Sequence, residues 1–218
     1  MSHVFTIAMK EWEWVKENPV RMVSRERKDR SKERWLTLEE EGRLLKESPP
    51  WLKDILTFAI HTGFRQSEIL DMQWSQVDLV RQLAWIHPDQ AKARKAIPVP
   101  LNADAVAIVT KQVGKHHAHV FSFRGKPIVQ VSTKAWYAAL ERAGIEDFRW
   151  HDLRHTWASW HVQNGTPLFA LQELGGWSST EMVRRYAHLA ANHLAPYAER
   201  LSAVRAEAMS HGTNPSQG

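Results

Sequence analysis

Helical and strand-like patterns occupy separate parts of this chain, and this order constrains the fold more than any other sequence feature. Apolar residues recur at helical spacing up to about Met72 and again after about Ser132. Between these regions, Gln82–His87 and Ala96–Pro100 have the pattern of two strands joined by a polar turn. A doubly wound sheet needs strands and helices to alternate. The sequence therefore predicts an α+β fold that is mainly helical, with a small antiparallel sheet.

Several of the predicted helices have recognisable ends. The amphipathic pattern over 2–17 ends at Asn18-Pro19, and Thr37 with Glu40 forms a capping box for the next helix. Gly63 is placed to end a helix in the left-handed conformation. Ser178 with Glu181 predicts another capping box. Further helices are predicted over 51–63, 65–72, 132–144, 151–164, from Thr166-Pro167 onward, 178–189 and 191–208, and a short extended piece over 119–123.

Composition limits the kind of protein that this chain can be. The formal net charge is +5, and the stretch from Arg21 to Trp35 holds seven Lys or Arg against three acidic residues. This charge agrees with a polyanionic partner. Cysteine is absent, which excludes disulfides and thiolate metal ligands. There is no secretory signal pattern and no apolar run of membrane-spanning length, so we expect a soluble protein of the cytoplasm.

Two segments in the first half of the chain carry conspicuous cations. Arg65 follows Gly63 at a predicted helix start, an arrangement that holds phosphates, and Glu68 lies one turn further on as a brace. An ordinary surface Arg–Glu pair explains the same spacing. Lys92, Arg94 and Lys95 fall on the turn between the two predicted strands, where they either reach a groove of a partner or face solvent.

A third segment, His151-Asp-Leu-Arg154-His155, places three functional side chains on one face of a predicted helix. A His beside an Arg suits phosphoryl transfer, because one moves a proton while the other neutralises oxyanion charge. The same residues faintly resemble the His-Glu-x-x-His pattern of zinc hydrolases. That alternative is weaker, because Asp152 is one methylene shorter than Glu and Arg154 would repel a metal cation.

A fourth segment contains Leu174-Gly-Gly-Trp177 and, shortly after it, Arg184-Arg-Tyr186-Ala-His188. Tyr186 shares a helical face with Met182 and Val183. Taken alone, Tyr186 is therefore expected to be a core residue.

The order of these segments resembles the signature of the tyrosine recombinases, in their phage-integrase branch. The matching motifs are Thr-Gly-x-Arg-x-x-Glu, a hairpin Lys before Val-Pro-Leu, His-x-x-Arg-His-Thr, Leu-Gly-Gly-Trp and Arg-Tyr-x-His, from about Trp35 to Leu201. The resemblance implies a recombinase catalytic domain that cuts and rejoins DNA through a 3′-phosphotyrosyl link. It also implies that no metal ion or other cofactor is needed.

The resemblance assigns the central roles residue by residue. Arg65 and Arg154 match the arginines that hold the scissile phosphate, and Tyr186 matches the nucleophile. Lys92 matches the hairpin lysine that protonates the leaving 5′ oxygen. His151 matches an acid/base or phosphate-binding histidine.

Trp177 is a further expected catalytic residue, and Glu68 and His155 are expected to be supporting ones. Trp177 stands where most relatives carry a second His, and its indole N–H still donates a hydrogen bond. Because an indole exchanges no proton, an acid/base role at this position is in doubt. Glu68 matches an acidic residue that organises the site, and His155 is expected to support it.

The resemblance also divides the chain. It implies that residues 1–19 are the last helix of a core-binding domain, 20–35 a basic linker, 36–209 the catalytic domain and 210–218 a disordered tail. We expect a fragment of a longer recombinase that binds double-stranded DNA and forms a tetramer on paired DNA sites, with a monomer or weak oligomer otherwise. Residues expected to contact DNA are Arg25, Arg27, Lys28, Arg94 and Lys95.

Two other functions remain open from the sequence. One is a DNA-binding or regulatory fragment that lacks full recombination activity. The other is a type IB topoisomerase, which shares the chemistry but would relax supercoils without site preference.

Overall fold

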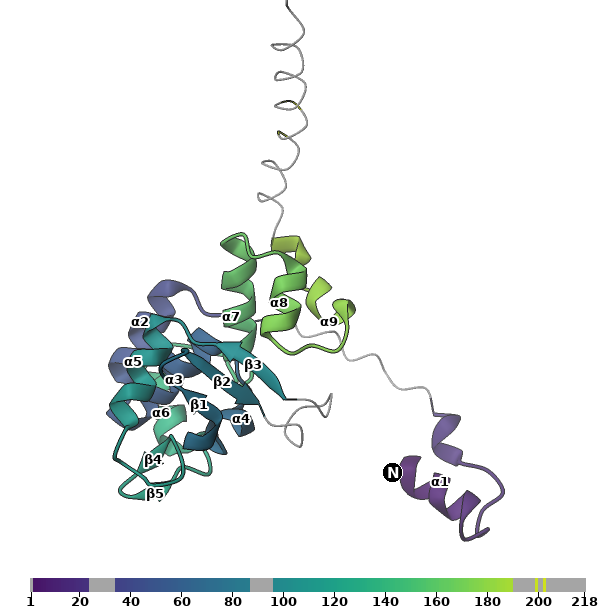
Figure 1. Ribbon diagram of the computed structural model, residues 1–218. Helices are drawn as coiled ribbons and strands as arrows, with labels where there is room; N and C mark the ends of the chain where they lie inside the picture. Colours follow the sequence, from purple (N-terminus) through teal and green to yellow (C-terminus); the bar gives the residue numbers. More distant parts are fainter. Residues whose placement is uncertain (1, 24–33, 87–95, 190–198, 200–201, 203–218) are drawn as a thin grey trace, which may run out of the picture. The chain divides into compact units, whose positions relative to one another are not determined.

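The computed structural model describes residues 2–23, 34–86 and 96–189, together with Glu199 and Ser202 (Figure 1). The chain divides into two compact units, Met1–Glu33 and Arg34–Gly218, and each is considered by itself. The basic residues predicted to contact DNA, the turn with Lys92 and most of the predicted helix 191–208 lie outside the described residues, as does the tail after 209.

The smaller unit contains helix α1 (Ser2–Lys10) and the 3₁₀ helix η1 (Pro19–Arg21). The amide of Asn18 donates to the Ser2 carbonyl over 2.9 Å, which ties the two helices together. The prediction of one helix over 2–17 was wrong in length. Glu13 takes a left-handed φ of 53°, and the Trp14 N–H returns to the Ala8 carbonyl, so the chain turns back after Lys10.

The larger unit is the predicted α+β arrangement of helices and small antiparallel sheets. Its helices are α2 (Leu38–Glu47), α3 (Pro50–Thr62), α4 (Gln66–Leu70), η2 (Trp74–Gln76), α5 (Ala103–Gln112), α6 (Lys134–Ala143), α7 (Asp152–Gln163), α8 (Leu168–Leu174) and α9 (Thr180–Arg184). Its strands are β1 (Val77–Asp78), β2 (Leu83–Ile86), β3 (Ile97–Pro100), β4 (Ser122–Phe123) and β5 (Lys126–Pro127).

The three-stranded sheet has the order β1-β2-β3, with every neighbouring pair antiparallel. Ile86 pairs with Ile97 and Leu83 with Pro100, which confirms the predicted hairpin. The edge position of β3 suits its two prolines, because an edge strand can lack ladder N–H groups. Strand β1 is too short to have been recognised from alternation.

Helix α3 forms the centre of the larger unit, where it packs against α5 and α7 (Figure 1). Its predicted stripe of Leu52, Ile55, Leu56 and Ala59 is buried. Helices α7, α8 and α9 pack against one another in sequence order. The site described below lies where α7 meets the turns that follow α3 and α8.

Local capping explains which helix boundaries were predictable. The capping box at Thr37 and Glu40 is present, and Gly63 ends α3 with φ 65° as expected. The box predicted at Ser178 does not form: α9 begins after Ser179 without a side-chain cap and ends at Arg184. Thr166 does not cap α8: Pro167 occupies the cap position without a side-chain hydrogen bond, and Thr166 Oγ1 lies 2.9 Å from His161 Nδ1.

Helix α5 was not predicted at all. Asn102 caps it by accepting from the Ala105 N–H, and Ala105 and Val109 are buried against the core.

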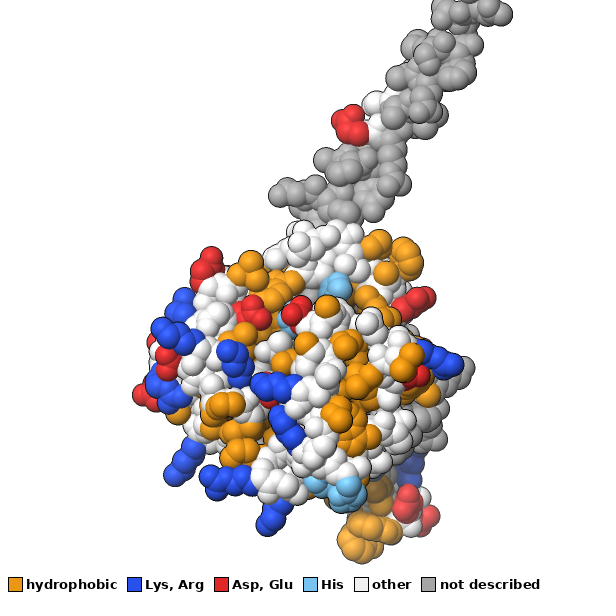
Figure 2. Space-filling view, turned by 60° about the vertical axis from the view of Figure 1, so that its left-hand side comes forward, with side chains coloured by type: hydrophobic (Ala, Val, Ile, Leu, Met, Phe, Trp, Pro, Cys, Tyr) orange, Lys and Arg blue, Asp and Glu red, His pale blue; other side chains and the backbone are white. Residues whose placement is uncertain are grey.

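On the face drawn in Figure 2, Lys and Arg side chains are spread among acidic and hydrophobic ones. No helix in the described part of the chain is long and apolar enough to cross a membrane.

Candidate active site

Arg154 joins three segments of the larger unit. It lies in the first turn of α7 and is buried. Its Nη1 donates to the carbonyl of Gly63, over 2.5 Å, and its Nη2 donates to the carbonyl of Gly175. The guanidinium therefore fastens the turn after α3 and the turn after α8 to α7.

The two glycines that bind Arg154 have no room for a side chain. A Cβ on Gly63 would lie 2.4 Å from the ring of Trp157, and one on Gly175 would lie 2.4 Å from the ring of Trp177. Each indole thus packs directly on a glycine backbone. Because the indoles fix these turns, the two carbonyls are held in place for the arginine.

Arg65 is fixed by Glu68 at the start of α4. The buried Glu68 carboxylate accepts from the Arg65 backbone N–H over 2.6 Å and also from its Nη1. The predicted contact between the two residues is present. Burial of the carboxylate distinguishes it from an ordinary surface pair, since a buried charge requires a partner. Arg65 is therefore fixed two residues after Gly63.

Tyr186 lies in the turn that follows α9, and only 1% of it is exposed. Its Oη lies 2.6 Å from Nδ1 of His155, the residue next to Arg154. Burial, with help from His151, lowers the pKa of His155 to about 4. His155 is therefore neutral at pH 7 and has one ring nitrogen free to accept a hydrogen bond.

His151 precedes α7 and packs edge to face on His155, with ring centroids 5.2 Å apart. Its pKa is lowered by burial and by the nearby charge of Arg154. His151 also lines an open pocket of about 420 Å³ with Arg65, Gln66 and Ser67. His151 thus contacts the hydrogen-bonded pair of His155 and Tyr186 on one side and lines, together with Arg65, a pocket on the other.

Trp177 contacts Arg154 through its ring face. The Arg154 Cζ lies 4.4 Å from the centroid of the Trp177 ring and 6.0 Å from that of Trp157. Burial, and then the neighbouring Arg65, lower the pKa of Arg154 to about 10. An aromatic face attracts a cation, so the two indoles favour the charged form that burial opposes.

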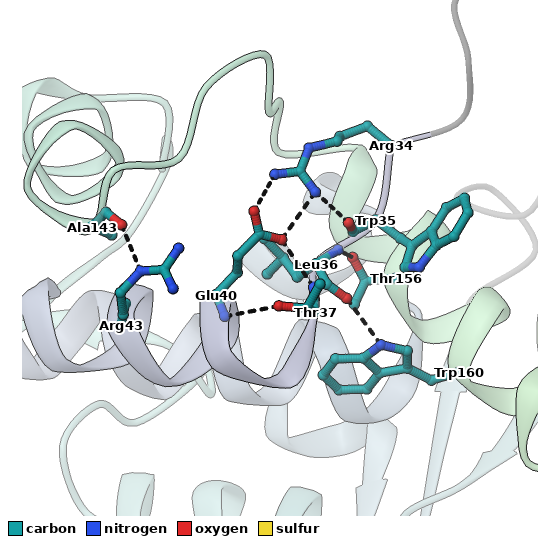
Figure 3. Close-up of polar contacts among 9 residues, drawn as sticks. All are labelled: Arg34, Trp35, Leu36, Thr37, Glu40, Arg43, Ala143, Thr156 and Trp160. Carbon is teal, nitrogen blue, oxygen red and sulfur yellow. Dashed lines mark hydrogen bonds and ion pairs between the residues drawn. The ribbon is translucent and has the colours of Figure 1, made fainter.

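A separate set of contacts ties the first residues of the larger unit to α7 (Figure 3). The Leu36 N–H donates to Thr156 Oγ1, and Trp160 Nε1 donates to the Leu36 carbonyl, both over 3.0 Å. Arg34 pairs with Glu40 at the start of α2. The helix that carries Arg154 and His155 is therefore also the helix that anchors the chain where it enters this unit.

Residues 34–193 match the model of the phage integrase family. This chain belongs to that family. The integrase of Salmonella phage P22 is 45% identical over 223 residues, which cover 95% of this chain and 57% of that protein. The chain thus spans little more than half the length of this relative.

Solved structures agree with the family assignment. The catalytic domain of bacteriophage HP1 integrase is 28% identical, has a TM-score of 0.59, and is matched over 84% of this chain and 98% of that one. A lambda integrase tetramer bound to a Holliday junction has the same fold, with a TM-score of 0.63 and 24% identity over 82% of this chain and 56% of that one.

The structure gathers the family motifs that lie within the described residues. Those side chains are Arg65, Glu68, His151, Arg154, His155, Trp177 and Tyr186. Lys92, Arg94, Lys95, Arg25, Arg27 and Lys28 lie outside the described residues. Sequence reasoning assigned no role to Trp157 and Trp160, and it quoted Thr156 only as the last residue of the third motif, although all three belong to the same helix. Their spacing showed only a buried helix and gave no sign of which backbone groups they contact.

The contacts of α7 also bear on the zinc-hydrolase alternative. Asp152, which occupies the place of the zinc hydrolases' Glu, binds Arg149 through both carboxylate oxygens. One ring nitrogen of His155 faces the Tyr186 hydroxyl. Within the described ranges, no three His, Asp or Glu side chains gather as metal ligands. Asp152 thus binds the guanidinium of Arg149, and His155 contacts the phenol of Tyr186.

Proposed function

We propose that this chain is the catalytic part of a site-specific recombinase that cuts and rejoins DNA through Tyr186. One observation carries the proposal. Arg154 donates to the carbonyl of Gly63, two residues before Arg65, while the neighbouring His155 contacts the Tyr186 hydroxyl. A nucleophile and two cations from separate parts of the chain therefore meet around one helix, which is the arrangement that phosphoryl transfer requires.

In the proposed reaction, Tyr186 Oη attacks a phosphorus of the DNA backbone. The Oη–P bond forms and the P–O5′ bond breaks, which leaves a 3′-phosphotyrosyl link and a 5′ hydroxyl. Arg65 and Arg154 neutralise the charge that develops on the phosphate oxygens. Lys92 gives a proton to the leaving oxygen, as the resemblance implies. A second 5′ hydroxyl then reverses the step, and the energy of the ester is kept in the link.

Arg154 suits this role because its guanidinium is already immobile. A guanidinium carries five N–H donors. The described contacts with Gly63 and Gly175 use one donor on each Nη. The remaining donors serve the phosphate in the proposal, so no conformational search of a long side chain is needed when DNA binds.

The proposed partner is double-stranded DNA. Arg25, Arg27, Lys28, Arg94 and Lys95 are proposed to contact its phosphates, so binding should weaken steeply as salt rises. We further propose a tetramer on paired DNA sites, in the cytoplasm, following the lambda integrase tetramer on its Holliday junction. In this proposal, residues 1–19 belong to a core-binding domain and 20–35 to a basic linker.

Covalent capture of DNA tests the proposal without knowledge of the target site. The chain is incubated with nicked duplexes of randomised sequence, protein–DNA adducts that survive detergent are isolated, and their DNA is sequenced. Adducts are expected with the unmodified chain and with Tyr137→Phe, a control at a 61% exposed tyrosine. They should vanish in Tyr186→Phe while DNA binding remains. Adducts that persist in Tyr186→Phe would refute the assignment.

The same adduct assay separates the alternatives. A chelator should leave adduct formation unchanged, and a loss of activity with EDTA would favour the zinc hydrolase. Adducts without strand exchange between two duplexes would indicate a competent but partial enzyme. Relaxation of supercoiled DNA without enrichment of any sequence would indicate a topoisomerase.

A further inference from the structure

The Tyr186 hydroxyl contacts His155, whereas the family resemblance assigns acid/base chemistry to His151. We propose that His155 is a catalytic residue in its own right: its Nδ1 accepts the phenolic proton of Tyr186 as Oη attacks phosphorus. This inference rests on the proposed function and names the group that activates its nucleophile. It concerns a position that family resemblance leaves with only a supporting part.

The geometry places the two reacting atoms at proton-transfer distance. Oη and Nδ1 are 2.6 Å apart, within the range of a hydrogen bond along which a general base acts. His155 is 8% exposed and Tyr186 is 1% exposed, so bulk water has little access to the pair. His155 follows Arg154 on α7. One helix thus positions both a phosphate-binding cation and the proposed base.

The surroundings keep His155 unprotonated before the reaction, while the same burial weakens it as a base. Burial opposes its protonation most strongly, and His151, Arg185 and Arg149 add repulsion, while Asp152 alone among these neighbours favours the cation. Imidazole therefore remains neutral at pH 7. A neutral ring carries its hydrogen on one nitrogen only, and the proposal requires that hydrogen on Nε2.

The proton has a defined course in both directions. During cleavage, the Oη–P bond forms, the P–O5′ bond breaks, the phenolic proton moves to Nδ1, and O5′ receives a proton from Lys92. During rejoining, the attacking 5′ hydroxyl returns a proton to Lys92, and His155 returns its proton to Oη as the phenol leaves. The two steps balance, so the site ends in its starting protonation state.

Two substitutions separate proton transfer from simple positioning. In His155→Asn, the amide oxygen lies near the place of Nδ1 and can hold the hydroxyl, but it accepts no proton at neutral pH. His155→Leu removes both functions. A matched control is His161→Asn, because His161 is on the same helix and its Nδ1 faces a different hydroxyl, that of Thr166, at 2.9 Å.

Single-turnover adduct formation is measured from pH 6 to 9 on a duplex enriched in the randomised selection. The unmodified chain and His161→Asn should show a rate that hardly changes over this range. Both His155 variants should lose about 100- to 10,000-fold at pH 7, the usual contribution of a general base. Their residual rate should climb about tenfold per pH unit, because only ionised phenol, with a pKa of about 10, then reacts.

The outcome for His155→Asn decides the proposal. A rate and pH profile like those of the unmodified chain would show that His155 only positions Tyr186, and would overturn it. A ¹⁵N spectrum of the DNA-free protein gives a second test, since a hydrogen on His155 Nδ1 would also overturn it. If the unmodified chain forms no adduct at all, the proposed function fails instead, so the two failures are distinguishable.

Discussion

The guanidinium of Arg154 lies on the face of the Trp177 indole, with Cζ 4.4 Å from the ring centroid. The family resemblance had suggested a different contribution, a hydrogen bond from the indole N–H in the place of a histidine. The observed contact instead makes the ring a support for the arginine. In addition, the indole packs on Gly175, whose carbonyl accepts from Arg154.

Substitution of Trp177 separates the ring face from the N–H. Trp177→Phe keeps an aromatic face under the guanidinium and should lower the free energy of unfolding by about 1 kcal/mol. Trp177→Ala leaves a cavity beside Arg154 and should lower it by about 3 kcal/mol. Urea denaturation measures both. Equal losses in the two variants would contradict a role for the ring face.

Gly63 and Gly144 form a matched pair for testing the close contact with Trp157. Both end helices in the left-handed conformation, with φ 65° and 64°, but an added Cβ meets Trp157 only at Gly63. Gly144→Ala should cost about 1 kcal/mol from backbone strain alone. Gly63→Ala should cost at least about 3 kcal/mol, because the indole must move. Similar unfolding midpoints for the two variants would show that Trp157 yields freely.

The lowered pKa of His155 predicts a loss of stability in acid. Above pH 6.5 the group is neutral in both folded and unfolded chains and has no effect. Between pH 6.5 and about 4 the unfolded chain binds a proton that the folded chain does not, so stability falls by about 3 kcal/mol from this residue. His151 and His161 act in the same direction.

Comparison with His155→Asn isolates that contribution. Urea denaturation at pH 7 and pH 4 should give a smaller acid-induced loss in the variant than in the unmodified chain. The difference between the two losses should approach about 3 kcal/mol, since the amide does not titrate. An identical acid-induced loss would mean that His155 is protonated as readily in the folded chain as in the unfolded one.

Thr156→Val tests the contacts drawn in Figure 3. Valine keeps the shape of threonine but leaves the buried Leu36 N–H without its acceptor, which should cost about 1 to 3 kcal/mol. Thr110→Val, at an exposed position of α5, is the control and should stay within about 0.5 kcal/mol. Thermal unfolding distinguishes them, and equal stability of the two variants would show that water replaces the lost acceptor.

Local chemistry explains what the sequence predicted well. The capping box at Thr37 and the left-handed Gly63 depend on neighbours within four residues, so both were readable. The buried stripe of α3 follows from spacing alone. The motif residues were identifiable because their types and order resemble a family, although no single motif was decisive by itself.

Part of what the sequence did not predict depends on contacts between distant segments. The hydrogen bond between His155 and Tyr186 spans 31 residues, and nothing in either motif names the partner of the other. Helix α5 was overlooked because its cap, Asn102, directly follows the edge strand β3 and Leu101. The early end of α1 depends on a left-handed Glu13, a conformation that a glutamate seldom adopts.

If Arg154 binds the phosphate as proposed, its two carbonyl contacts make a structural effect and a catalytic effect inseparable at this position. A lysine there would offer a single nitrogen, which from one point would not reach both turns as well as the proposed phosphate. Loss of activity after replacing Arg154 would therefore reflect the separation of two turns as much as a missing charge. Arg65 has the same difficulty in another form, because removing its guanidinium would take a charged partner from the buried Glu68 carboxylate.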